Sequence, residues 1–413
     1  MKTYLTKAEL KLMEVIWEKG QIPSNKLVKE CLERFNWKKS TTYTNLKKLV
    51  DKKMVCNSEA VITVLKSRED YENGKITRED LTKVEDECIT KLVSKQKELG
   101  YKVITDGEFR RATWHLDFMW GFNGVGHQKT ETGLPFHGEA AMIDDTYLTG
   151  KVSLGEHPFI EHFKFIKQFE DENTVAKLTI PAPAQFLEQM IMPFAWDNSK
   201  KYYNTTDEIA IDIANGYKKF IKDAYAAGCR NLQLDDCSWG MLVDENACQF
   251  FGTDSKGLEK IKKQLVDINN LAIEDKPEDM IINTHVCRGN FHSTYASSGA
   301  YDSVAETLFA KENVNAYYLE FDDERSGGFE SLSKVTGDKK VVLGLITTKS
   351  PVLEDKETVI KRINEAAKYI SLDRLYLSPQ CGFASCEIGN KLTEEQQWAK
   401  LKLVKEIAEE VWK

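Results

Sequence analysis

Side chains that bind metal ions or carry protons gather near the ends of short β-branched runs in this 413-residue chain. They are Asp106 at the end of 101–106 and Glu108 just after it, Asp235 and Asp236 at the end of 231–236, His285 in 280–286 and Cys287 directly after it, Glu320 in 315–321, and Cys381 after 374–379. Imidazole, thiolate and carboxylate groups together are ligands of Zn²⁺.

His285 and Cys287 are the clearest indication of a metal site. On an extended segment residues i and i+2 point the same way, so the imidazole and the thiol share one side. A His-x-Cys pair alone more often packs than ligates, but Cys381 and Glu320 at neighbouring strand ends complete a four-coordinate set for Zn²⁺. Cys386 is an alternative ligand to Cys381. We interpret four other cysteines as buried small apolar residues: Cys88, Cys229, Cys237 and Cys248.

Such a ligand set predicts a particular chemistry. Zinc with thiolate ligands lowers the pKa of an incoming thiol and holds it as a nucleophilic thiolate at neutral pH. The carboxylate of Glu320 is the ligand that is easiest to displace. The residues therefore predict transfer of an alkyl group to a substrate thiol, with zinc activating the nucleophile.

The runs that end in these side chains belong to an alternating pattern of predicted strands and helices. Predicted strands are 101–106, 175–181, 231–236, 280–286, 315–321, 340–347 and 374–379, and helix patterns cover 208–227, 257–275, 355–370 and 393–412. This pattern predicts an α/β fold with a (β/α)8 TIM-type barrel, in which chemistry lies at the carboxyl ends of the strands. The run 61–65 is the candidate eighth strand. An open doubly wound sheet is the alternative, but no Gly-rich phosphate loop follows any strand.

The first part of the chain predicts three short helices in a helix-turn-helix arrangement. Thr6, Ser24 and Ser40 are suitable N-caps, and Gly20 ends the first helix. The third helix is basic, like a recognition helix that enters the DNA major groove. Lysines would contact phosphates, and Thr41, Thr42 and Thr44 could reach base edges. The candidate DNA-binding residues are Lys38, Lys39, Ser40, Thr41, Thr42, Thr44, Lys47 and Lys48. A helical bundle with a solvated lysine face is the alternative.

The charge of the chain is divided unevenly. The whole sequence has 57 Lys+Arg against 65 Asp+Glu, a net charge of −8. Residues 1–65 hold 13 Lys and Arg against 7 Asp and Glu, a balance of +6, which leaves −14 for 66–413. We therefore predict two domains, 1–65 and 66–413, with partners of opposite charge. No run approaches the ~18 apolar residues of a membrane span, and no signal peptide begins the chain, which predicts a cytoplasmic protein.

Two segments of the basic part have a familiar sequence. "LTKAELKLMEVIWEKG" and "WKKSTTYTNLKKLVDKKMV" resemble the penicillinase-repressor family of winged-helix regulators over roughly residues 3–65. The likeness is specific at Glu9, Met13, Trp17 and Trp37–Thr41, and it implies binding to duplex DNA. Two departures are expected: the wing, 55–65, is abbreviated, and from about Lys66 another sequence replaces the family's dimer-forming helices.

Five motifs of the second part occur together and in order. "VITDGEFRR", "LQLDD", "INTHVC", "YLEFDDERSG" and "LSPQCGFAS" resemble the catalytic barrel of cobalamin-independent methionine synthase, most of all its shorter single-barrel relatives, over roughly 66–413. The resemblance implies zinc-dependent methyl transfer from a donor such as methyltetrahydrofolate to homocysteine, which gives methionine. It implies that His285, Cys287, Glu320 and Cys381 hold zinc, and that Glu108 and Asp235 hold the amino group of homocysteine.

The second part also departs from this family. It lacks the Gly-Ser segment after the first strand that helps to bind the amino-acid carboxylate. The histidine that protonates the leaving group is absent, and Lys349 lies there as a candidate acid or a solvated lysine. Asp106 and Trp114 complete the candidate substrate site, Trp114 by stacking on a flat donor or by core packing. The alternatives are a zinc thiol alkyltransferase with a non-folate donor, a DNA-binding regulator with a ligand-sensing barrel, and an inactive fusion.

Overall fold

A computed structural model describes residues 5–19, 24–51, 59–130 and 133–413. Their packing divides the chain into two compact units, Met1–Thr90 and Lys91–Lys413. The division therefore lies further along the chain than the predicted boundary at 65/66, because two more helices follow the basic helix in the first unit.

The first unit contains α1 (Lys7–Lys19), α2 (Ser24–Phe35), α3 (Lys39–Asp51), α4 (Glu59–Glu72) and the beginning of α5 (Arg78–Glu98). The three predicted helices are confirmed. Thr6 caps α1 in a capping box: its Oγ1 accepts the Glu9 N–H at 3.3 Å, and its own N–H donates to Glu9 Oε2 at 2.6 Å. A small core holds α1, α2 and α3 together: Leu12, Met13, Val15, Leu27, Cys31, Leu46 and Leu49.

The predicted eighth strand is wrong. Residues 61–65 lie within α4, and so does the described part of the expected wing, whose residues 55–58 lie outside the described chain. The β-branched run favours a strand by itself, but it is continuous with the helix-forming segment 65–72. Helix formation is cooperative, so the longer segment determines the conformation of the shorter one.

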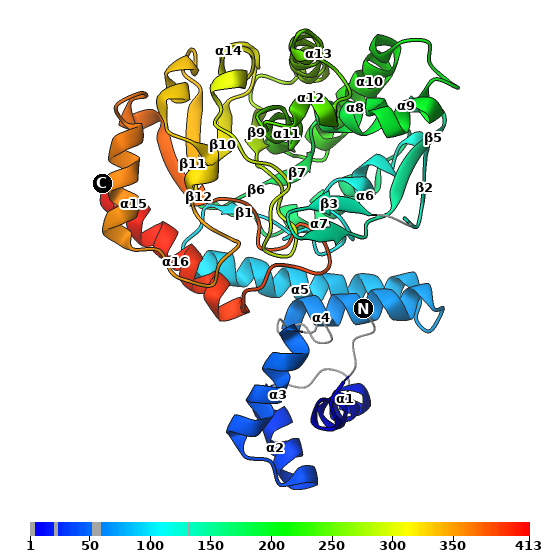
Figure 1. The fold of residues 1–413 in the computed structure, drawn as a ribbon, viewed down its shortest axis with the longest axis vertical. Coiled ribbons are helices and arrows are strands. Elements are labelled where there is room, and N and C mark those ends of the chain that lie inside the picture. Colours follow the sequence, from blue (N-terminus) through cyan, green and yellow to red (C-terminus); the bar gives the residue numbers. More distant parts are fainter. Residues whose placement is uncertain (1–4, 20–23, 52–58, 131–132) are drawn as a thin grey trace. The chain divides into compact units, whose positions relative to one another are not determined.

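The second unit is built on parallel strands (Figure 1). They are β1 (Val103–Ile104), β6 (Val175–Ala176), β7 (Leu178–Pro181), β8 (Asn231–Asp235), β9 (Ile281–Val286), β10 (Ala316–Glu320), β11 (Lys340–Ile346) and β12 (Leu375–Pro379). All seven predicted runs contain strands, and the run 175–181 contains two. The parallel α/β fold is thereby confirmed.

The strands form two sheets, which do not close into a ring. β7 to β12 pair in chain order in a six-stranded sheet, and β1 pairs with β6. Among the described residues, no pairing joins β12 to β1, so a closed barrel is not observed. All five residues of β8 are buried, as expected for a parallel strand covered on both faces.

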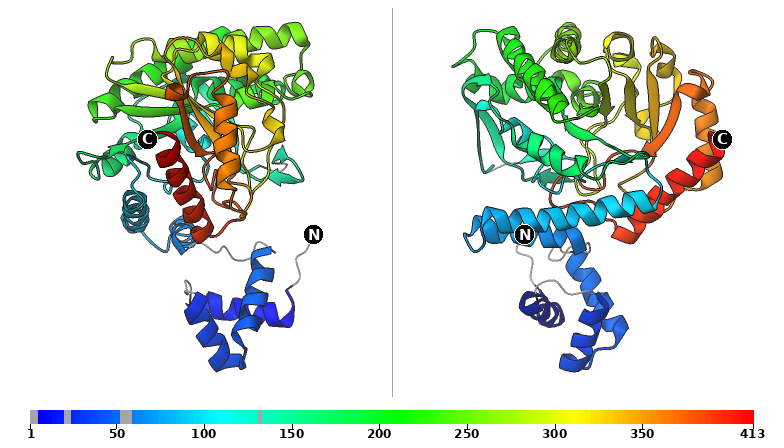
Figure 2. Two further views of the ribbon diagram at one scale, coloured as in Figure 1. Left: turned by 90° about the vertical axis from the view of Figure 1, so that its left-hand side faces the viewer. Right: turned by 180° about the vertical axis from the view of Figure 1, so that it is seen from behind.

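Helices alternate with these strands, and Figure 2 shows α15 and α16 outside β11 and β12. The helices are α6 (Leu116–Met119), α7 (Pro158–Lys167), α8 (Pro183–Ile191), α9 (Pro193–Ser199), α10 (Thr206–Ala226), α11 (Ser238–Leu242), α12 (Ala247–Phe250), α13 (Ser255–Ile273), α14 (Asp302–Lys311), α15 (Lys356–Ala366) and α16 (Glu394–Val411), with 3₁₀ turns η1 (Glu324–Ser326), η2 (Glu330–Lys334) and η3 (Leu372–Arg374). The four predicted helices correspond to α10, α13, α15 and α16. No helix among the described residues is long and apolar enough to cross a membrane.

The segment 122–174 contains antiparallel hairpins. β2 (Asn123–Gln128) pairs antiparallel with β5 (Asp145–Ser153), and β3 (Leu134–Phe136) with β4 (Glu139–Ala141). The turn of the smaller hairpin holds the loop that follows β9: the His137 N–H donates to Tyr295 O and Thr294 Oγ1 donates to His137 O, both at 2.8 Å.

Three buried carboxyl groups lie behind β8. Asn269 Nδ2 donates to Asp236 at 2.9 Å and to Glu312 at 2.8 Å, and Gln185 donates to Glu188 at 3.2 Å. Burial raises the pKa of Glu188 and of Glu312 to about 8, and the pKa of Asp236 to about 6. The folded protein therefore keeps protons on these groups that an unfolded chain would lose near pH ~4.3.

This difference in pKa predicts that the protein becomes less stable as the pH rises. The stabilisation is complete below the unfolded pKa near ~4.3 and is lost as the pH passes through about 8. Each group contributes a slope of up to ~1.4 kcal/mol per pH unit. Urea unfolding between these limits measures the slope. Glu188→Gln should reduce it, while the exposed control Glu161→Gln should not; equal slopes in all three proteins would contradict the prediction.

Candidate metal centre and substrate site

Three of the predicted zinc ligands lie together. His285 is in β9, Cys287 follows β9 and Cys381 follows β12, and their ligand atoms all lie within 4.8 Å of one another. His285 Nε2 is 3.3 Å from Cys381 Sγ. Its Nδ1–H donates to Tyr318 O at 3.0 Å, which leaves Nε2 free to face the sulfur atoms.

The surroundings of Cys287 favour its thiolate form. Hydrogen bonds from Cys237 and Cys381 hold the pKa of Cys287 well below its usual range, and His285 adds to the effect. Burial opposes a charged His285, but the Cys287 thiolate outweighs it and the pKa of His285 is raised. One imidazole and two thiols that lie this close form a donor set that fits Zn²⁺.

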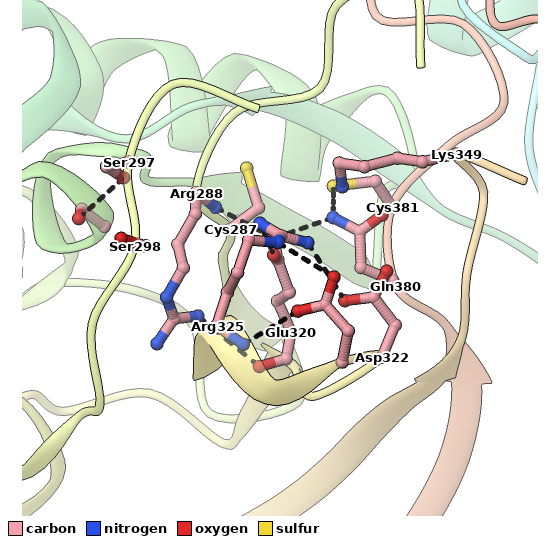
Figure 3. Close-up of polar contacts among 12 residues, drawn as sticks. Cys287, Arg288, Ser297, Ser298, Glu320, Asp322, Arg325, Lys349, Gln380 and Cys381 are labelled. Atoms are coloured by element: carbon pink, nitrogen blue, oxygen red, sulfur yellow. Dashed lines mark hydrogen bonds and ion pairs between the residues drawn. The ribbon is translucent and has the colours of Figure 1, made fainter. Parts of the chain in front are cut away.

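Glu320 lies beside this group and outside it. Its Oε2 accepts the Arg288 N–H at 2.9 Å and Gln380 Nε2 at 2.7 Å, while its Oε1 is 2.9 Å from Arg325 Nη1 (Figure 3). A buried carboxylate needs a charged partner, and a guanidinium provides one with two N–H groups. As it stands, Glu320 pairs with Arg325, and it would have to exchange that partner to ligate a metal.

Gln380 links the carboxylate to the metal ligands. The same Nε2 that donates to Glu320 donates to Cys381 Sγ at 2.9 Å, and its Oε1 accepts Thr348 Oγ1 at 3.0 Å. Sequence reasoning did not select Gln380 or Arg325, although both lie in the motifs that it quoted. Only the position of Gln380, directly before Cys381, could have suggested its role.

Lys349, the candidate acid, points into the site. Figure 3 shows its side chain ending beside Cys381. Its Nζ is buried and has no hydrogen-bond partner among the described residues. The side chain of Asp322 is also buried, and its Oδ1 is 3.6 Å from Arg325 Nη2. Burial raises the pKa of Asp322, and the charge of Lys349 opposes this rise.

The two carboxylates predicted to hold an ammonium group also lie close enough to influence each other. Burial raises the pKa of Glu108 to about 7, Arg111 opposes the rise, and the charge of Asp235 adds to it. Burial raises the pKa of Asp235 as well. The Glu108 side chain is 22% exposed, so a ligand can reach it.

The backbone at Glu108 is strained. Its φ is +59°, in the left-handed region that residues other than glycine rarely adopt. The Glu108 N–H donates to Asp106 Oδ1 at 2.9 Å, so Asp106 orients the turn. Thr179 Oγ1 donates to Glu108 at 2.5 Å and Arg111 Nη1 lies 3.0 Å from it. Sequence reasoning did not identify Thr179 or Arg111 as partners of Glu108.

Trp114 joins this turn to the loop after β12. Its carbonyl accepts Arg111 Nη1 at 3.3 Å, and its N–H donates to Ser385 O at 3.1 Å. Its half-buried ring stacks on His115 with 4.3 Å between centroids. Cys386, the alternative ligand, pairs through its backbone with Thr113 and lies outside the metal group.

The candidate DNA-binding side chains lie at the beginning of α3 and along it. Those exposed are Lys38, Lys39, Ser40, Thr41, Thr44 and Lys48. Thr42 is 1% exposed and faces the helical core, so its prediction as a base contact is wrong. Lys47 lies within α3, but its side chain is outside the described part of the chain.

The fold and the site define an α/β protein with a His-Cys-Cys centre at the carboxyl ends of parallel strands. The family model for the catalytic domain of cobalamin-independent synthase matches residues 196–410 of the sequence. The chain belongs to this family. The penicillinase repressor model matches residues 5–96. The second match includes α4 and most of α5, so the expectation that the likeness stops near Lys66 is wrong.

The chain is also similar to individual proteins and to solved structures. The chain is 44% identical to the uncharacterized protein YxjH of Bacillus subtilis over 85% of this chain and 92% of that protein. A crystal structure from Listeria monocytogenes, provisionally assigned as a vitamin-B12-independent methionine synthase, has 38% identity and a TM-score of 0.66, and the match covers 85% of this chain and 94% of that one. The methionine synthase of Pyrococcus horikoshii is 23% identical over 75% of this chain and 79% of that protein.

Proposed function

We propose that the second unit transfers a methyl group to the thiol of homocysteine and forms methionine. The observation that carries the proposal is the group of His285, Cys287 and Cys381 beside the carboxylates Glu108 and Asp235. The strands β7 to β12 pair in chain order, which supports a (β/α)8 barrel as the proposed architecture of the unit.

His285, Cys287 and Cys381 would hold Zn²⁺, which supplies a Lewis acid that lowers the pKa of a bound thiol. Glu320 is the proposed fourth ligand, and it must leave Arg325 to act as one. Other residues of the chain would position the ligands and bind the substrates. Gln380 positions Cys381 through the hydrogen bond to its sulfur.

The carboxylates and Lys349 would act on the substrates. Glu108 and Asp235 would bind the ammonium group of homocysteine, with Thr179 and Arg111 fixing the Glu108 carboxylate. The donor's leaving group needs a proton, and the buried Nζ of Lys349 is the proposed source. The ring of Trp114 is the proposed surface for a flat donor such as methyltetrahydrofolate.

The test is methionine formation by the full chain with measured zinc content. Homocysteine is supplied with methyltetrahydrofolate in one series and with a simpler, non-folate methyl donor in another. We expect methionine in at least one series and only in the zinc-loaded protein. Zinc-loaded protein that produces no methionine from either donor would refute the proposal.

We propose in addition that the first unit binds duplex DNA. The exposed lysines at the start of α3 and along it, and the match to the penicillinase repressor family, support this role. If the chain binds DNA and homocysteine but forms no methionine, the alternative of a ligand-sensing regulator would be favoured.

Salt dependence tests the DNA-binding role in the full chain. Lys48→Gln should weaken binding to all duplexes and should reduce the slope of log K against log salt by about 1, because one phosphate contact is lost. The control is Lys29→Gln on α2, an exposed lysine outside the proposed interface. No binding at low salt, or equal slopes for both variants, would remove the proposal.

A further inference from the structure

A fourth cysteine lies against the metal group, although the sequence suggested a buried apolar role for it. Cys237 Sγ is 3.1 Å from Cys287 Sγ. Cys237 lies outside the set of ligand atoms that are mutually within 4.8 Å, so it extends the group only on the side of Cys287. The structure therefore contains a thiol pair in addition to the His-Cys-Cys centre.

The backbone explains why these two thiols meet. Asp235 and His285 are register partners in β8 and β9, and the Asp236 N–H donates to His285 O at 2.8 Å. Cys237 and Cys287 each lie two residues beyond that registered pair. A Cβ added at Gly240 would lie 2.0 Å from Cys287 O, so the segment after Cys237 packs directly on the Cys287 backbone.

The separation of the sulfur atoms is close to that of a bond. A disulfide has an S–S length of about 2.05 Å, so the sulfurs must approach by roughly 1 Å.

Cys381 is the competing partner for Cys287. Its sulfur is already contacted by two nitrogen atoms, Gln380 Nε2 at 2.9 Å and His285 Nε2 at 3.3 Å. Cys237 has neither of these contacts, and its short contact is with Cys287. The geometry thus favours Cys237 as the sulfur that Cys287 would bond.

We propose that Cys237 and Cys287 form a reversible disulfide when the metal-free protein meets a peroxide. One thiol of the pair, as its thiolate, attacks one peroxide oxygen, which breaks the O–O bond and gives a sulfenic acid and, after protonation, water. The sulfur of the other cysteine then attacks the sulfenic sulfur, and the S–O bond breaks with release of a second water. The two thiols lose two protons and two electrons in total, and the peroxide is reduced to two waters.

The disulfide would make Cys287 unavailable to a metal. This consequence rests on the proposed zinc site, whereas the disulfide itself does not depend on any catalytic activity. A thiol reductant reverses the bond, so the pair would act as a modification site that switches metal binding.

The experiment uses the full chain freed of metal and treated with hydrogen peroxide, with and without later dithiothreitol. Peptide mass mapping after alkylation should find Cys237 joined to Cys287, and a coloured zinc chelator should show that zinc uptake is lost and then restored. Cys237→Ser should take up zinc normally and keep doing so at peroxide levels that stop the wild-type protein. Cys248→Ser is the control and should behave as wild type.

Three results would overturn the proposal. They are a disulfide between Cys287 and Cys381, equal peroxide sensitivity of wild type and Cys237→Ser, or loss of zinc from untreated Cys237→Ser, which would make Cys237 a ligand instead. None of these readouts measures methionine formation. Failure of the redox pair and failure of the proposed methyl transfer are therefore distinguishable.

Discussion

Replacement of Cys381 by serine is expected to remove bound zinc and to lower kcat/KM for methionine formation by ~10³-fold or more. The sulfur of Cys381 is one of only three ligand atoms that lie together in the described structure. A serine hydroxyl does not ionise at neutral pH and binds zinc poorly, so two ligands would remain. Zinc content and steady-state kinetics measure the two effects.

The control is Cys386→Ser, a substitution in the same loop. Cys386 lies outside the metal group, and its backbone pairs with Thr113. We expect it to retain zinc and activity. If Cys381→Ser kept its zinc while Cys386→Ser lost it, the assignment of ligands along this loop would have to be reversed.

Replacement of Arg325 by alanine is expected to lower the free energy of unfolding of the second unit by about 3–5 kcal/mol. Arg325 pairs with Glu320 and Asp322, whose side chains are both fully buried. Its removal leaves the two buried carboxylates without the guanidinium that balances their charge. An uncompensated buried charge lowers the free energy of unfolding more than replacement of the whole ion pair by apolar residues would. Urea unfolding, followed by a signal from the second unit, measures the change.

Two further variants separate charge from packing. Adding Glu320→Gln to Arg325→Ala should restore part of the lost stability, because one of the unpaired charges is removed. Lys263→Ala removes an exposed ion pair with Asp267 and should change stability little. If Arg325→Ala were as mild as Lys263→Ala, the buried ion pairs would not be important to the fold.

The positions of His285, Cys287 and Cys381 were predictable because they depend on the simplest rules of a parallel sheet. Side chains alternate along each strand, and the carboxyl ends of neighbouring strands lie at one edge. In the structure, His285 pairs in register with Asp235 of β8 and with Tyr318 of β10. The long strands were predictable for this reason, whereas β1 retains only two residues of its predicted run.

The partners of these residues were not predictable in the same way. Arg325 reaches Glu320 from the 3₁₀ turn η1, and Gln380 turns its amide between Glu320 and Cys381. Such contacts depend on loop conformations that have no sequence period. The prediction of a strand at 61–65 was wrong for a different reason. The β-branched residues of this segment form a strand or a helix according to the residues that surround them, and here they lie in α4.

The close approach at Gly240 has a consequence for how this sequence can change over time. Only hydrogen fits between the α-carbon of residue 240 and the carbonyl oxygen of Cys287, since a methyl group would overlap that oxygen. Every other amino acid would therefore push the Cys287 backbone away. Selection for an intact site would retain glycine at a position whose own side chain has no chemical role.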